Sequence, residues 1–265
     1  MSEAAQRLEA LLRLMAQLRD PQRGCPWDRV QSFASIAPHT VEEAYELADA
    51  IESADPGRIR DELGDLLFQV VFLAQLGLES GWFDFAAVAA ALHDKLVRRH
   101  PHVFGGEGAR TADLAKAWDA HKSAERAAAG VYGALAGVPK ALPALARAAK
   151  LGRRAAHVGF DWSDAQAVRA KIGEELQETE AAVRQHNPLA VEEELGDLLF
   201  AIVNWARHLD VDPEAALRGA NHKFERRFGA MEALMAQRGW TAAELTAGQW
   251  ELLWGEVKAQ EGRES

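Results

Sequence analysis

Cysteine is almost absent from this 265-residue sequence, which contains only Cys25. A single cysteine cannot form an intrachain disulfide, and it cannot supply the ligands of a cysteine-rich zinc site. A chain without such crosslinks suits a reducing compartment, so we expect the protein to be cytoplasmic.

Long apolar runs are also missing. The longest one, LLFQVVFLAQLGL at residues 66–78, contains two glutamines and is shorter than the roughly 20 residues that cross a bilayer. The first 20 residues carry charges throughout and space their leucines as an amphipathic helix does, whereas a signal peptide needs an uninterrupted apolar segment. The sequence therefore predicts neither a membrane span nor a leader.

Basic residues are outnumbered, since 30 Lys and Arg against 40 Asp and Glu give a formal net charge of −10. Binding to nucleic-acid backbones or to anionic lipids needs clustered cations. We therefore expect no general nucleic-acid binding and no membrane association. A local basic pocket remains compatible with this balance.

Strand signals are scarce, because alternating runs of β-branched residues are nearly absent. Apolar residues instead recur three and four apart, as at Leu63, Leu66 and Leu67. Turn-forming stretches such as ADPGR at 54–58 and HNPLA at 186–190 interrupt this pattern. The expected fold class is all-α.

The sequence does contain an internal repeat. RDELGDLLFQVV at 60–71 returns as EEELGDLLFAIV at 192–203, a shift of 132 residues. The same shift superposes two sets of acids without a gap, and shifts of 128 and 136 superpose basic residues and a W-x-x-x-K segment. The superposed sets are Glu42, Glu43, Glu46, Glu62, Asp65, Lys95, Arg99, Trp118 and Lys122 on Glu174, Glu175, Glu178, Glu194, Asp197, Lys223, Arg227, Trp254 and Lys258.

This repeat predicts two helical-bundle modules in tandem, at residues 1–127 and 141–265. A stretch rich in Gly and Ala at 128–140 is the expected linker between them.

The repeated acids are spaced to share one cleft. Glu174, Glu175 and Glu178 fall on one face of a helix, and Glu194 and Asp197 project together from the next helix. Carboxylates this close repel one another unless a cation or protons bind between them. Oxygen ligands without His or Cys favour Mg²⁺, or alternatively Mn²⁺. Four apolar residues are expected to draw the second helix into the core: Leu195, Leu198, Leu199 and Phe200.

Each of these patterns also has a plain structural interpretation. An isolated EExxE is usually a solvated helix face with lysines four residues away, but such lysines are mostly missing here. Lys223 and Arg227 could form an exposed basic surface, although beside a carboxylate site they suit phosphate groups. Trp254 could belong to the core or could stack on a nucleobase.

The pattern EExxE, then ExxD, then K-x-x-R-R and a late W-x-x-x-K resembles the MazG family of nucleoside triphosphate pyrophosphohydrolases, in its two-module form and over nearly the whole chain. The resemblance implies an all-α homodimer that cleaves (d)NTPs to monophosphate and pyrophosphate with Mg²⁺, tolerates many bases and uses its C-terminal module for catalysis. The implied metal ligands are Glu175, Glu178, Glu194 and Asp197, and the implied nucleotide contacts are Lys171, Glu174, Lys223, Arg227, Trp254 and Lys258.

The residues agree with this chemistry. Glu174 or Glu175 is the expected water-activating group, since a carboxylate that is not fully engaged by metal can act as a general base. No GxxxxGK[ST] loop occurs, so a P-loop ATPase is excluded, and no Glu-x-x-His pair occurs, which argues against a ferritin-like di-metal site. The alternative is a regulatory protein that binds Mg²⁺ and nucleotide without turnover.

The two copies differ one turn before their acids, where His39 aligns with Lys171. Near pH 7 an unperturbed histidine is mostly neutral, whereas a lysine is charged. We therefore expect catalysis in the C-terminal copy. The N-terminal acids are a second metal site in which we expect weak binding: Glu43, Glu46, Glu62 and Asp65.

Overall fold

The computed structural model describes residues 2–104, 130 and 132–264, and every regular element in that part of the chain is a helix. The all-α prediction is therefore confirmed. The chain divides into two compact units, Met1–His121 (unit 1) and Lys122–Ser265 (unit 2). The predicted module boundary at residue 127 lies outside the described residues, as do Trp118 and Lys122. Among the described helices, none is both long and apolar enough to cross a membrane.

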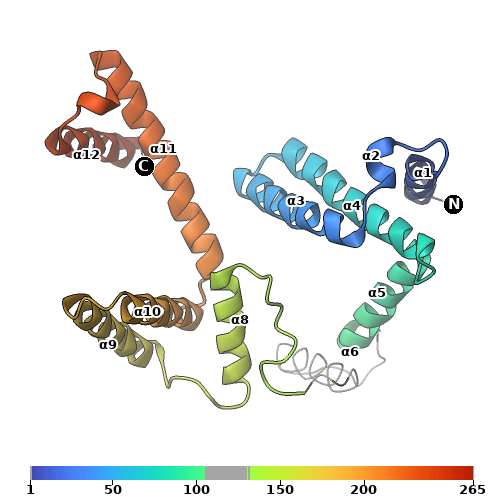
Figure 1. Ribbon diagram of the computed structural model, residues 1–265, viewed down its shortest axis with the longest axis horizontal. Coiled ribbons are helices and arrows are strands. Elements are labelled where there is room, and N and C mark those ends of the chain that lie inside the picture. The colour runs from blue at the N-terminus through green and yellow to red at the C-terminus, as the bar shows by residue number, and fades with distance from the viewer. Residues whose placement is uncertain (1, 105–129, 131, 265) are drawn as a thin grey trace. The chain divides into compact units, whose positions relative to one another are not determined.

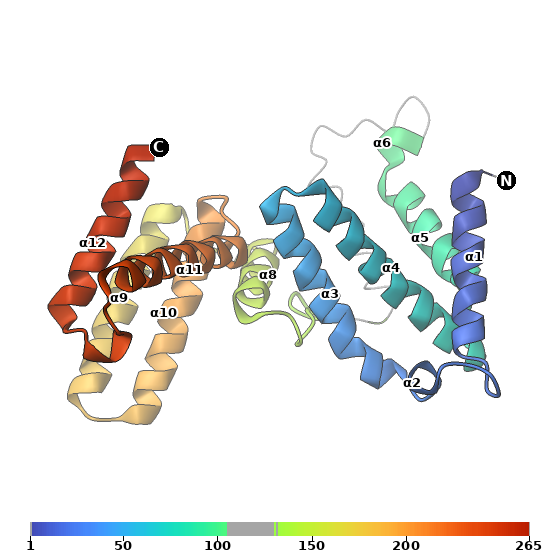
Figure 2. The same ribbon diagram turned by 90° about the horizontal axis from the view of Figure 1, so that it is seen from above.

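Unit 1 is organised around a pair of long helices, α3 and α4, which lie side by side (Figures 1 and 2). Helix α1 packs on α4 and contributes Met15 to a core that also contains Ile36 from α3 and Phe72 from α4. The helices are α1 (Glu3–Leu18), α2 (Pro26–Arg29), α3 (Phe33–Ser53), α4 (Pro56–Glu79), α5 (Phe85–Arg99) and α6 (Pro101–Phe104).

Unit 2 repeats this pair as α9 and α10, and α8 packs against α10. A further helix, α11, pairs with α12 around Met231, Met235, Leu253 and Val257. The elements are α8 (Ala144–Ala156), α9 (Ala165–Arg184), α10 (Pro188–His208), α11 (Pro213–Arg238), the 3₁₀ turn η1 (Ala242–Glu244) and α12 (Ala247–Glu264).

The turn inside each helix pair is repeated residue for residue. A left-handed residue with φ of 53° follows the first helix, the next side chain caps the second helix by accepting a backbone N–H, and a proline begins that helix. This short reversal makes the two helices of each pair antiparallel neighbours. The three positions are Ala54, Asp55 and Pro56 in unit 1 and His186, Asn187 and Pro188 in unit 2.

One prediction about packing is wrong. Four apolar residues beside the acids of α10 were expected to lie in the core, but Leu195, Leu199 and Phe200 are exposed by 46%, 49% and 37%. Leu198 is half-buried. Ala201, Val203 and Asn204, on another face of α10, are buried instead. Among the described residues, the apolar side chains of the ELGDLLF segment are therefore largely exposed.

Candidate functional site

Three acidic side chains of unit 2 converge between α9 and α10. Glu175 comes from α9, Glu194 and Asp197 come from α10, and one carboxylate oxygen of each lies within 4.8 Å of the others. Glu175 is buried, with 5% of its surface exposed, whereas Asp197 is exposed. A buried carboxylate that faces two others needs a counter-charge. We call this group the C-terminal acid cluster.

Glu178, the fourth predicted ligand, is exposed and lies beside this cluster rather than inside it. The charge of Glu178 nevertheless affects the pKa of Glu194. Partial burial raises the pKa of the Glu194 carboxyl, and the like charges of Glu178, Glu175 and Asp197 raise it further. The repulsion among these carboxylates favours the binding of a cation or of protons between them.

Lys171 supplies one fixed positive charge. Its Nζ lies 2.7 Å from Oε1 of Glu174 and 2.7 Å from Oε1 of Glu175. These hydrogen bonds, first to Glu174 and then to Glu175, raise the pKa of Lys171 well above its usual range. The lysine therefore stays charged and links the exposed Glu174 to the buried Glu175. Sequence reasoning placed a cation here but did not foresee that it contacts both acids.

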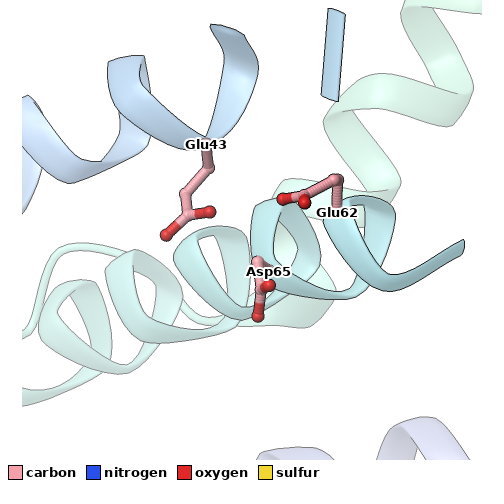
Figure 3. A group of neighbouring side chains, drawn as sticks. All are labelled: Glu43, Glu62 and Asp65. Atoms are coloured by element: carbon pink, nitrogen blue, oxygen red, sulfur yellow. The ribbon is translucent and has the colours of Figure 1, made fainter. Parts of the chain in front are cut away.

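Unit 1 contains the matching N-terminal acid cluster. Glu43 points from α3 toward Glu62 and Asp65 on α4 (Figure 3), and one oxygen of each lies within 4.8 Å of the others. Burial raises the pKa of Glu43, and the charges of Asp65 and Glu46 raise it further. Glu46, predicted with this group, is exposed and remains outside the tight set, as Glu178 does in unit 2.

Sequence reasoning missed Gln69, a buried neighbour of the N-terminal acid cluster. It is 3% exposed, and its Nε2 donates a hydrogen bond of 3.4 Å to Oε1 of Glu43. A usable signal was present, because Gln69 follows Asp65 by four residues and so shares its helix face, within an otherwise apolar run.

His39 does not replace Lys171. Its Nδ1 lies 3.5 Å from Oε2 of Glu42, which is not a member of the N-terminal acid cluster. In the part of unit 1 that the structure describes, no Lys, Arg or His forms an ion pair with Glu43, Glu62 or Asp65.

The other predicted nucleotide contacts lie on α11 and α12. The Arg227 guanidinium stacks over Trp254 at 5.4 Å from the ring centroid, and Trp254 and Lys258 line a hollow of about 500 Å³. Lys223 is exposed, one turn before Arg227 on α11. Half of the residues that line the hollow are aromatic: Phe224, Phe228, Trp250 and Trp254.

Glu261 is a second residue that sequence reasoning missed. Its carboxylate accepts hydrogen bonds from Nε of Arg227 at 2.8 Å and from Nη2 of Arg226 at 2.9 Å, and these contacts lower its pKa. Glu261 ends the WGEVKAQE motif, so its position in the motif was the available signal.

The predicted site residues thus fall into two groups. Lys171 and the five acids lie on α9 and α10, whereas Lys223, Arg227, Trp254 and Lys258 lie on α11 and α12. Between these two groups of described residues there is no hydrogen bond or ion pair.

Comparisons with known proteins agree with this arrangement. The sequence profile of the MazG nucleotide pyrophosphohydrolase domain matches residues 31–104 and 163–229, so each match contains one acid cluster. The chain is 48% identical to a nucleoside triphosphate pyrophosphohydrolase of Escherichia coli (strain K12) over 96% of this chain and 98% of that protein.

Two further relatives carry related names. The nucleoside triphosphate pyrophosphohydrolase/pyrophosphatase MazG of Thermotoga maritima is 42% identical over 97% of this chain and 98% of its own length. A nucleoside triphosphate pyrophosphohydrolase of Mycobacterium tuberculosis is 36% identical over 59% of this chain and 48% of its own. With both helix pairs matched and two relatives aligned over nearly their full length, the chain belongs to the MazG nucleotide pyrophosphohydrolase family.

Proposed function

We propose that this protein hydrolyses nucleoside triphosphates and deoxynucleoside triphosphates to monophosphate and pyrophosphate, and that its C-terminal acid cluster carries the reaction. The observation that carries the proposal is the contact of Lys171 with Glu174 and Glu175 at the edge of three converging carboxylates. The relatives named as pyrophosphohydrolases support the choice of substrate.

The donor set of the C-terminal acid cluster fits Mg²⁺, with Mn²⁺ as a substitute, because it is made of carboxylate oxygens whose mutual repulsion is already visible at Glu194. Glu175, Glu194 and Asp197 would hold the ion, with Glu178 completing the set. When bound, the metal neutralises part of the triphosphate charge and polarises the phosphoryl group under attack.

Glu174 is the better placed of the two candidate bases. Glu175 is buried within the C-terminal acid cluster, whereas Glu174 is exposed at its edge and is held by Lys171. We therefore assign to Glu174 the acceptance of the proton from the attacking water, and to Glu175 the holding of metal.

Lys223, Arg227 and Lys258 would neutralise the charge that develops on the departing pyrophosphate. The aromatic hollow that contains Trp254 suits the base, because any nucleobase has a face that can stack on an aromatic ring. Stacking of this kind would be compatible with many different bases.

We assign catalysis to the module at 141–265 and a supporting role to the module at 1–127. The exposed Leu195, Leu199 and Phe200 form an apolar surface that a second copy would cover, so we propose a homodimer. The single cysteine supports a cytoplasmic location, and the net charge of −10 argues against nucleic-acid and membrane partners.

The test is a panel of NTPs and dNTPs incubated with the purified chain and Mg²⁺, with products resolved by ³¹P NMR. We expect monophosphate and pyrophosphate from every nucleotide, activity lost in EDTA and activity restored by Mg²⁺ or Mn²⁺. Diphosphate and phosphate as products would contradict the proposal. Binding of nucleotide without any turnover would favour the regulatory alternative.

A further inference from the structure

The α11–α12 pair holds one carboxylate between two adjacent arginines. Glu261 lies in the last turn of α12, and each of its oxygens faces a different arginine of α11. Oε2 accepts a hydrogen bond of 2.8 Å from Nε of Arg227, whereas Oε1 accepts hydrogen bonds of 3.2 and 2.9 Å from Nε and Nη2 of Arg226. The proposed function assigns a phosphate contact to Arg227 but gives Glu261 no role.

The contact with Arg227 uses the inner end of the guanidinium. Among the residues that the structure describes, Glu261 bonds Nε of Arg227, and neither terminal amino group of this arginine forms a hydrogen bond. The two terminal amino groups of a guanidinium form a rigid fork that matches the oxygens of a phosphate. Arg227 is therefore held at its stem and keeps its outer donors for an anion.

Trp254 holds the same guanidinium on its face. Its ring centroid lies 5.4 Å from Cζ of Arg227. A group that is stacked on its face and hydrogen-bonded at its edge has little freedom to rotate. Trp254, Lys258 and Glu261 are four and three residues apart, so they share one face of α12.

Glu261 stays ionised while it holds the two arginines. The hydrogen bonds from Arg227, followed by those from Arg226, lower the pKa of Glu261. Its charge therefore orders Arg227 before any ligand arrives. An arginine that is already ordered avoids part of the side-chain entropy that binding otherwise costs.

The alternative is a purely mechanical role, since Glu261 also ties α12 to α11. Another ion pair joins the same two helices, because Arg238 of α11 donates to Glu256 of α12. The side chains of Glu256 and Glu261 are exposed by 32% and 28%, so the two acids are closely matched. Glu256 therefore allows the two roles to be separated.

We propose that Glu261 is a positioning residue that orients Arg227 toward the phosphate groups of the nucleotide. The inference rests on the proposed function for the identity of the ligand. A fixed guanidinium should contribute more than a mobile one, because a misplacement of about 1 Å can lower a rate by up to about 100-fold.

The first measurement is kcat/KM of the full chain for one dNTP with Mg²⁺. Glu261→Ala should lower it about tenfold, whereas the control Glu256→Ala should change it little. Adding Glu261→Ala to Arg227→Ala should have no further effect, because Glu261 acts through Arg227. Thermal unfolding should show similar losses of stability for Glu256→Ala and Glu261→Ala, so stability alone would not separate them.

Two kinetic results would overturn the proposal. One is a loss from Glu261→Ala that is as large in the Arg227→Ala background as in the wild type. The other is an equal loss of kcat/KM from Glu256→Ala and Glu261→Ala. Either result would mean that Glu261 acts on the packing of α11 against α12 rather than on Arg227.

A second measurement separates this inference from the proposed function. Calorimetric titration with an α,β-imido dNTP, which resists cleavage between its first two phosphates, reports phosphate contact without turnover. Glu261→Ala should weaken its binding about tenfold, and Glu256→Ala should not. This pattern in a protein that cleaves no dNTP would refute the proposed function and keep the inference.

The same titration can also refute the inference while the proposed function stands. Unchanged binding by Glu261→Ala would show that Arg227 needs no positioning. Tighter binding would show that Glu261 competes with phosphate for Arg227. Either result, or no binding of the analogue by the wild type, would overturn the proposal.

Discussion

Asp161 holds the segment that leads into α9, the helix of Lys171 and Glu175. Arg207 donates to both of its carboxylate oxygens, one of them at 3.0 Å, and Nε2 of His208 lies 3.1 Å from Oδ1. The hydrogen bonds from Arg207, followed by that from His208, lower the pKa of Asp161 to about 2. Asp161 therefore ties the start of α9 to the end of α10.

This lowered pKa makes the stability depend on pH with a defined sign. The ionised Asp161 stabilises the fold fully above its ordinary pKa near 4, and that contribution is lost as the pH falls toward 2. Asp161→Asn should lower the free energy of unfolding by about 1 kcal/mol at pH 7, allowing for solvent screening of a partly exposed pair.

Urea denaturation of the wild type and of Asp161→Asn, at pH 7 and again at pH 3, measures this difference. The exposed Asp210, two residues after the end of α10, supplies the control Asp210→Asn, which should have a small effect that is the same at both pH values. A difference between wild type and Asp161→Asn that is equally large at both pH values would contradict the assignment.

At the scale of helices, the packing of α8 on α10 depends on Gly152. A Cβ atom there would overlap Oδ1 of Asn204, which is fully buried, and would approach Nε of Arg207 to 3.2 Å. Gly152→Ala should therefore destabilise the protein by about 1–3 kcal/mol, although alanine favours helix formation.

Gly219 in α11 provides the comparison, since a Cβ there meets nothing within 4 Å. Gly219→Ala should leave the free energy of unfolding unchanged or raise it by up to about 1 kcal/mol. Chemical denaturation of both variants checks the pair. Equal effects of the two substitutions would contradict the prediction that close packing of α8 on α10 excludes a side chain at Gly152.

The sequence contained enough to predict the two helix pairs and their acids. Turn signals at ADPGR and HNPLA located the reversals, and the helical period placed Glu175, Glu194 and Asp197 on facing surfaces. It could not predict that Leu195 and Leu199 are exposed, because periodicity identifies an apolar face but not what covers it.

The sequence also could not predict that the cations of α11 and α12 form no hydrogen bond or ion pair with the acids of α9 and α10. These cations are Lys223, Arg227 and Lys258. A repeat aligns residues along the chain, but the direction in which α11 leaves its turn depends on tertiary contacts. The additional partners Gln69 and Glu261 were missed for a related reason, since a single amide or carboxylate in a motif has no periodic signature.

At the scale of the whole protein, an uncovered apolar surface next to each acid cluster argues for a second copy. Leu63 and Leu67 on α4 are exposed by 51% and 38%, in parallel with Leu195 and Leu199 on α10. Large contiguous apolar surface is unfavourable in water, so association should be strong. Light scattering at micromolar concentration should give the mass of a dimer, and a monomer would contradict this prediction.

We expect one copy of the duplicated site to carry turnover and the other to support the fold. The direct measurement compares Asp197→Asn with its counterpart Asp65→Asn, each assayed for pyrophosphate release from the same dNTP with Mg²⁺ after circular dichroism has confirmed the helical content. Each substitution removes one charge from an exposed member of its acid cluster. Asp197→Asn should lower turnover about 100-fold or more, and Asp65→Asn should keep most of the rate. The reverse result, or an equal loss in both variants, would contradict the account.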